Sequence, residues 1–182
     1  MIKIAIVVGS TRPGRKADVV AKWAHDIAKR RSDADYELVD IQEFNLPLLD
    51  EPVPPSMGKY SKDHTKKWAA KVATFDGFVF VTPEYNHGPS AALDYLYAEW
   101  NNKAAGFVAY GSAGGVRAVE QLRLVMGELQ IADVRAQVTL SLATDFENYT
   151  TFKPAERHEK AVGVVLDQVV SWSTALKTVR TR

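Results

Sequence analysis

The sequence contains no cysteine, and this absence excludes several chemistries at once. Disulfide bonds, thiolate nucleophiles and cysteine-bound metals are all ruled out. The four histidines, His25, His64, His87 and His158, are scattered along the chain without the spacing of metal ligands. We therefore expect neither a metal site nor catalysis by a thiolate.

Long apolar runs and an excess of one charge are also missing. No run approaches the ~20 residues that a membrane-spanning helix needs, and the chain passes directly from Met1 into a predicted strand. The 23 Lys and Arg residues nearly balance the 22 Asp and Glu residues, so no nucleic-acid surface is indicated. We expect a cytoplasmic protein without a membrane or nucleic-acid partner. Its 182 residues, 46% of them apolar, are enough for one well-buried domain over residues 1–182.

What the sequence does contain is a regular alternation of short apolar runs and amphipathic stretches. The runs predict strands, and the apolar spacing after each run predicts a helix. The last strand alternates apolar and polar residues, which is typical of a half-exposed edge strand. In the last helix, an apolar stripe that includes Val164, Trp172 and Val179 is expected to face the sheet. The predicted strands are residues 3–8, 36–41, 77–82, 106–110 and 134–140, and the predicted helices carry residues 20–28, 61–75, 93–100, 122–129 and 154–179.

Five strands, each followed by a helix, predict an α/β fold with a doubly wound parallel sheet. Right-handed crossovers with helices on both faces favour the flavodoxin-like strand order 2-1-3-4-5. In that order, the ligand crevice opens at the carboxyl ends of the first and third strands, with the fourth beside them. We therefore expect residues 9–15, 83–89 and 111–115 to meet at one edge of the sheet.

The first of these loops, residues 9–15, has the features of an anion site. It leaves a buried strand and enters a helix, so free backbone N–H groups and the positive helix end lie beside its hydroxyls and arginines. A phosphate is the expected anion. The same residues would also suit an ordinary solvated turn. The P-loop motif fails at Arg15 and Lys16, and the dinucleotide motif fails at Thr11, so a simpler phosphomonoester is indicated.

The second and third loops favour a flat ligand. Two prolines stiffen residues 83–89, and Tyr85 can form an aromatic wall. Alternatively, Asn86 and Ser90 are ordinary helix caps. Residues 111–115 lack bulky side chains, which permits close approach of a flat ligand but also suits any tight turn between a strand and a helix.

Together, the three loops resemble the NADPH-dependent FMN reductase family of flavodoxin-like quinone, azo and chromate reductases. The matching segments are residues 9–15, 83–87 and 110–118, and the resemblance extends from the first strand to Phe146. It implies FMN as cofactor and NADPH or NADH as co-substrate. The site residues that it implies are Ser10, Thr11, Arg12 and Arg15 at the FMN phosphate, Pro83, Glu84, Tyr85 and Asn86 along the isoalloxazine, and Gly111, Ser112, Gly114 and Gly115 at its other edge.

The resemblance also implies an activity. NAD(P)H passes a hydride to flavin N5, and a quinone, flavin or similar small acceptor then takes its place in a ping-pong exchange. The chemistry resides on the flavin, so no catalytic side chain is expected. A homodimer or a dimer of dimers is expected as well. The alternatives are a flavodoxin-like electron carrier and a flavin-poor regulatory member of the same fold.

One segment departs from the family pattern. Ala92 and Leu93 pass straight to Asp94, as though four residues, including a lysine, were missing. Four residues are about one helical turn, so the predicted helix keeps its apolar face and shortens by ~6 Å. In related proteins this helix lies near the dimer contact and the flavin, so the shortening bears on both.

Overall fold

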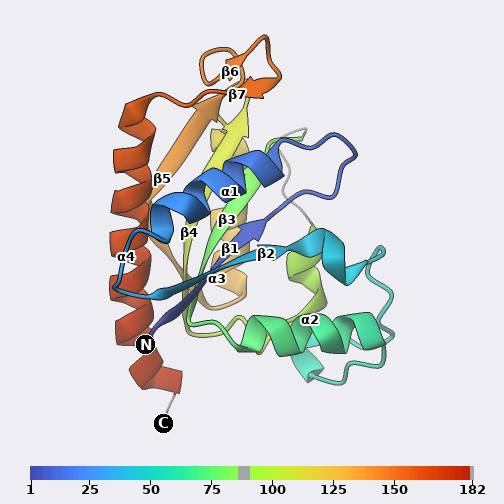
Figure 1. The fold of residues 1–182 in the computed structure, drawn as a ribbon. Coiled ribbons are helices and arrows are strands. Elements are labelled where there is room, and N and C mark those ends of the chain that lie inside the picture. The colour runs from blue at the N-terminus through green and yellow to red at the C-terminus, as the bar shows by residue number, and fades with distance from the viewer. Residues whose placement is uncertain (86–90, 181–182) are drawn as a thin grey trace.

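A five-stranded parallel sheet forms the centre of the molecule (Figure 1). The computed structural model describes residues 1–85 and 91–180. The sheet has the order β2-β1-β3-β4-β5, which confirms the predicted topology. Its strands are β1 (Lys3–Val8), β2 (Asp35–Asp40), β3 (Gly77–Pro83), β4 (Lys103–Gly111) and β5 (Ile131–Ser141).

Helices cover both faces of this sheet (Figure 1). Successive side chains of β1 point to opposite faces, so Ile6 packs in the layer of α1 and α4 while Val7 packs in the layer of α2 and α3. Because both faces are buried, the central strands are continuous apolar runs. No helix within residues 1–85 and 91–180 combines the length and the hydropathy needed to cross a bilayer. The helices are α1 (Ala17–Ala28), α2 (Asp63–Ala73), α3 (Val116–Glu128) and α4 (Glu156–Arg180).

Short elements fill the connections at the carboxyl edge of the sheet. Two 3₁₀ turns, η1 (Ile41–Phe44) and η2 (Pro55–Met57), lie between β2 and α2. A small antiparallel hairpin of β6 (Phe146–Glu147) and β7 (Thr151–Phe152) lies between β5 and α4. Each strand of this hairpin is only two residues long, which is too short to produce a periodic pattern in the sequence.

The helix predicted after Ser90 was wrong in type. The described part of this segment forms a five-residue 3₁₀ helix, η3 (Ala91–Tyr95), followed by turns. Two indole N–H groups account for the difference. Trp68 donates to the Ala92 carbonyl at 3.1 Å and Trp100 donates to the Leu93 carbonyl at 3.2 Å. In an α-helix, these two carbonyls would instead accept hydrogen bonds from backbone N–H groups of the next turn.

The predicted stripe on the last helix was wrong in part. Val164, Trp172 and Val179 are exposed, whereas Val162 and Leu166 are buried. Apolar residues occupy two neighbouring lines of this long helix, and only one line lies against β4 and β5. The spacing of apolar residues in the sequence does not distinguish the two lines, so it predicts a single stripe.

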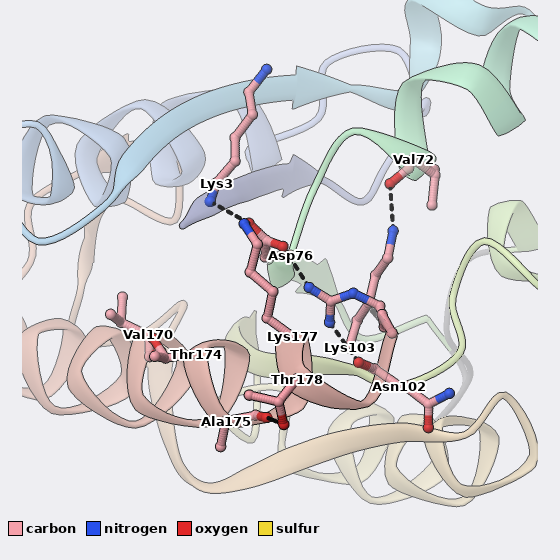
Figure 2. Close-up of polar contacts among 11 residues, drawn as sticks. Lys3, Val72, Asp76, Asn102, Lys103, Val170, Thr174, Ala175, Lys177 and Thr178 are labelled. Atoms are coloured by element: carbon pink, nitrogen blue, oxygen red, sulfur yellow. Dashed lines mark hydrogen bonds and ion pairs between the residues drawn. The ribbon is translucent and has the colours of Figure 1, made fainter. Parts of the chain in front are cut away.

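Asp76 fixes the opposite, amino-terminal edge of the sheet (Figure 2). Its carboxylate accepts hydrogen bonds from the Lys3 backbone N–H at 2.9 Å and from the Arg180 guanidinium at 2.5 Å. Arg180 also donates to the Asn102 carbonyl at 2.6 Å. Through Asp76, these bonds attach the end of α4 to the first strand.

Lys103 lies buried beside this cluster (Figure 2). Its ammonium donates to the Val72 carbonyl at 2.9 Å and lies 5.5 Å from the centre of the Phe78 ring. Burial lowers the pKa of this lysine to about 8. The ammonium loses its proton more easily in these surroundings than in water, because one carbonyl does not replace the full hydration of the charged group.

We predict that Lys103 makes the folded protein more stable as the pH rises. Between about pH 8 and the lysine's ordinary pKa of 10.5, the unfolded chain binds more protons than the folded one, so the free energy of unfolding increases by up to about 3 kcal/mol. Lys103→Met should remove this increase and stabilise the protein near pH 7. Urea unfolding at several pH values measures it, with the exposed Lys59→Met as control. An unchanged pH dependence in Lys103→Met would refute the assignment.

Candidate functional site

The three loops meet at the carboxyl edge of the sheet around a cavity of about 300 Å³. We call it the cofactor cavity, after the ligand that we propose for it below. Asn86 lies outside the described residues. Thr11 lines a neighbouring cavity, and Ser112, Gly114 and Gly115 do not line the cofactor cavity. The residues that do line it are Arg12, Pro13, Gly14, Arg15 and Lys16 from the first loop, Pro83, Glu84 and Tyr85 from the second, Tyr110 and Gly111 from the end of β4, and Leu142 and Tyr149.

Backbone contacts hold the first loop close to β3. The Gly9 N–H donates to the Val81 carbonyl at 2.9 Å, and a Cβ on Gly9 would lie only 2.7 Å from that oxygen. Only glycine therefore permits this approach. The buried hydroxyl of Ser10 lies 3.4 Å from the Tyr85 hydroxyl, which connects the first loop to the second.

Arg15 connects the same loop to β2. Its guanidinium forms a bidentate ion pair with Asp40 and donates to the Ser10 carbonyl at 2.5 Å. Asp40 stands opposite Val8 in the parallel register, so the end of β2 lies directly beside the loop. Bidentate pairs of this kind fix geometry as well as charge. In this arrangement Arg15 positions the loop.

Arg12 and Lys16, in contrast, form no ion pair with any described carboxylate. The Arg12 guanidinium is exposed and lies 5.5 Å from the centre of the Tyr85 ring. The Lys16 ammonium lies 6.0 Å from the centre of the Phe146 ring. Both cations line the cofactor cavity, so two positive charges there are available to a ligand.

The N-terminus of α1 is also open toward a ligand. Its N-cap residue, Lys16, makes no capping hydrogen bond, and no side chain among the described residues accepts from the N–H groups of the first turn. Asp18 in that turn lines a separate cavity of about 280 Å³ behind the loop. Unpaired N–H groups and the positive end of the helix dipole favour an anion at this point.

The N-terminus of α3 is closed by Glu84. The Glu84 carboxylate accepts from the Arg117 backbone N–H at 3.1 Å and from the Arg117 guanidinium at 2.6 Å. Burial alone would raise the pKa of Glu84, but these hydrogen bonds outweigh it and hold the pKa below its usual value. The second loop is thereby attached to the third.

Backbone geometry explains the glycines of the third loop. Gly115 has a φ of +76°, and a Cβ there would lie 2.6 Å from that of Ala109. The tight turn into α3 therefore requires glycine at this position whatever the ligand.

Sequence reasoning missed Tyr110 as a site residue. Tyr110 lines the cofactor cavity, and its buried hydroxyl has no hydrogen-bond partner among the described residues. Burial, with the Tyr85 phenol nearby, raises the pKa of Tyr110 above its usual value. The signal available in the sequence was one aromatic residue at the end of a strand of mostly small residues. Leu142 and Tyr149 were also missed, because they lie in the aperiodic stretch after β5.

Comparison with known proteins shows which family this chain belongs to. The model of the NADPH-dependent FMN reductase family matches residues 2–145. This chain belongs to that family. It is 40% identical over 167 residues to an NAD(P)H-dependent FMN reductase of Schizosaccharomyces pombe, covering 88% of this chain and 84% of the relative. It is 39% identical over 159 residues to another from a Nectria species, covering 80% and 79%.

Solved structures show the same fold at low sequence identity. The flavoenzyme FerB of Paracoccus denitrificans, an NAD(P)H:(acceptor) oxidoreductase, superimposes with a TM-score of 0.72 at 17% identity, covering 96% of this chain and 98% of that one. A flavodoxin from Pseudomonas aeruginosa gives a TM-score of 0.51 at 17% identity, covering 95% and 99%. The fold is therefore flavodoxin-like.

Family membership makes the protein an FMN-dependent oxidoreductase that uses NAD(P)H. The cofactor cavity fits this cofactor. A phosphate monoester matches the open end of α1 together with Arg12 and Lys16. The unpartnered hydroxyl of Tyr110 supplies a further donor that a bound ligand would satisfy.

We predict that Arg12→Ala weakens FMN binding by about 10- to 100-fold, since a hydrogen bond to a charged group contributes about 1.5–3 kcal/mol. The melting temperature of the FMN-free protein should not change, because Arg12 is exposed and forms no ion pair with any described carboxylate. Fluorescence titration of FMN measures the affinity, and Arg135→Ala, an exposed arginine on β5, is the control. Wild-type affinity in Arg12→Ala would contradict the phosphate assignment.

Proposed function

We propose that this protein carries electrons from NAD(P)H through bound FMN to a small quinone- or flavin-like acceptor, in a ping-pong sequence. The observation that supports it best is the open N-terminus of α1 beside a cavity between the three loops. Arg12 and Lys16, which form no ion pair with any described carboxylate, are among the residues that line this cavity. This arrangement suits a ligand with a phosphate at one end and a flat, neutral body.

In this proposal, each loop has a separate role toward FMN. Bound FMN supplies the redox chemistry, because its ring system accepts and returns hydride equivalents. Arg15 contributes by holding the phosphate-binding loop against Asp40. The proposed contacts are Ser10, Thr11, Arg12 and Lys16 at the phosphate, Pro83, Glu84, Tyr85 and Asn86 along the ring, and Tyr110, Gly111, Ser112, Gly114 and Gly115 at its far edge.

The protonation states of two side chains limit what the protein can add. The lowered pKa of Glu84 keeps its carboxylate ionised near neutral pH. The carboxylate is already hydrogen-bonded to Arg117 at the N-terminus of α3. Glu84 is therefore not a proton donor in this proposal. The raised pKa of Tyr110 keeps its phenol protonated, so Tyr110 can donate a hydrogen bond throughout the physiological range.

We predict that double-reciprocal plots are parallel when the rate of NADPH oxidation is measured with 2-methyl-1,4-naphthoquinone as acceptor. The concentration of one substrate is varied at several fixed concentrations of the other. Parallel lines follow if the oxidised product NADP⁺ leaves before the acceptor binds. Intersecting lines would contradict the ping-pong order. An FMN-loaded protein that does not oxidise NADPH in the presence of the quinone would contradict the enzymatic function itself and indicate an electron carrier.

A further inference from the structure

The β6–β7 hairpin brings one aromatic side chain to the cofactor cavity. The hairpin follows the carboxyl end of β5, at the edge of the sheet where the three loops meet (Figure 1). Tyr149, which lies between β6 and β7, is one of the residues that line the cavity. The family model matches residues 2–145, so the hairpin begins directly after the matched part of the chain. The family match therefore assigns no role to Tyr149.

The turn of this hairpin places Tyr149 in a backbone conformation that disfavours a bulky side chain. The Thr150 N–H donates to the Glu147 carbonyl at 3.0 Å and closes a β-turn. Both central residues have a positive φ, +51° at Asn148 and +58° at Tyr149, as in a type I′ turn. Asparagine adopts this conformation readily, but the second position is usually glycine. A tyrosine there is an outlier that costs stability.

Contacts within the protein do not explain this tyrosine. The Tyr149 side chain is 65% exposed, and it makes no hydrogen bond or ring contact within residues 1–85 and 91–180. Packing therefore offsets little of the backbone strain. A strained residue that the fold itself does not require is typical of a ligand site. The cofactor cavity is the site that Tyr149 lines.

The base of the hairpin is anchored, so the position of the turn is fixed. The buried Asp145 carboxylate lies 2.9 Å from the Nε2 atom of His158, at the start of α4. The buried Phe146 ring packs against Phe152 at a centroid distance of 5.1 Å, which joins β6 to β7. The turn can therefore present Tyr149 to a ligand with little loss of conformational entropy.

The chemistry of Tyr149 suits the flat part of the ligand. The cations Arg12 and Lys16 and the open end of α1 are available to the phosphate, whereas an aromatic face stacks on another flat ring system. We propose that Tyr149 covers the isoalloxazine ring of bound FMN and contributes to its affinity. This inference rests on the proposed function, because it takes the cofactor cavity as the FMN site.

Tyr149→Gly removes the ring and relieves the backbone strain, so it should have two opposite effects. The dissociation constants of FMN and of riboflavin, measured by flavin fluorescence with FMN-free protein, should both rise about tenfold, because the two flavins share the ring. The melting temperature of the FMN-free protein should rise by about 2 °C, because glycine adopts a positive φ without strain. A lower melting temperature would mean that Tyr149 stabilises the hairpin, and would overturn the inference.

Two matched variants separate the ring from the turn. Asn148→Gly changes the neighbouring turn residue and keeps the ring, and Tyr149→Phe removes only the hydroxyl, so both should bind FMN within about twofold of the wild-type protein. A loss in Tyr149→Phe as large as that in Tyr149→Gly would contradict the stacked ring.

The same titrations separate this inference from the proposed function. Wild-type FMN affinity in Tyr149→Gly, in a protein that binds FMN and oxidises NADPH, would overturn this inference alone. A wild-type protein that binds no FMN would overturn the proposed function and this inference with it.

Discussion

The contact between Glu84 and the N-terminus of α3 determines how the rest of the site is organised. Two helices, α1 and α3, direct their positive ends toward the same edge of the sheet. The buried Glu84 carboxylate neutralises α3 and pairs with Arg117, so this end offers no net attraction to a second anion. The end of α1 stays open beside Arg12 and Lys16. A ligand with one phosphate therefore has a single preferred orientation in the cavity.

The remaining polar contacts hold the described parts of the three loops in this arrangement. Arg15 and Asp40 attach the first loop to β2, the hydroxyls of Ser10 and Tyr85 approach each other across two loops, and Glu84 attaches the second loop to the third. A loop that is already ordered loses little conformational entropy on binding. The same first loop separates the cofactor cavity, which is lined by cations, from a neighbouring cavity whose lining residues are uncharged.

The sheet and the meeting of the three loops were predictable because burial on both faces produces apolar runs, and right-handed crossovers fix their order. The partners of individual side chains could not be predicted. The sequence could not separate Arg12 from Arg15, because the difference depends on Asp40 lying opposite Val8 in the next strand. In the sequence, Tyr110 resembles an ordinary core residue, and only the structure shows that its hydroxyl has no partner among the described residues. The 3₁₀ form of η3 depends on the indole of Trp68, 24 residues away in the chain.

The comparison of FMN with riboflavin tests the central claim most directly, since the two differ only in the phosphate. If the open end of α1 with Arg12 and Lys16 binds that phosphate, the protein should bind FMN at least about 100-fold more tightly than riboflavin, as two charged contacts of about 1.5 kcal/mol each imply. Equal affinities for the two flavins would contradict the account.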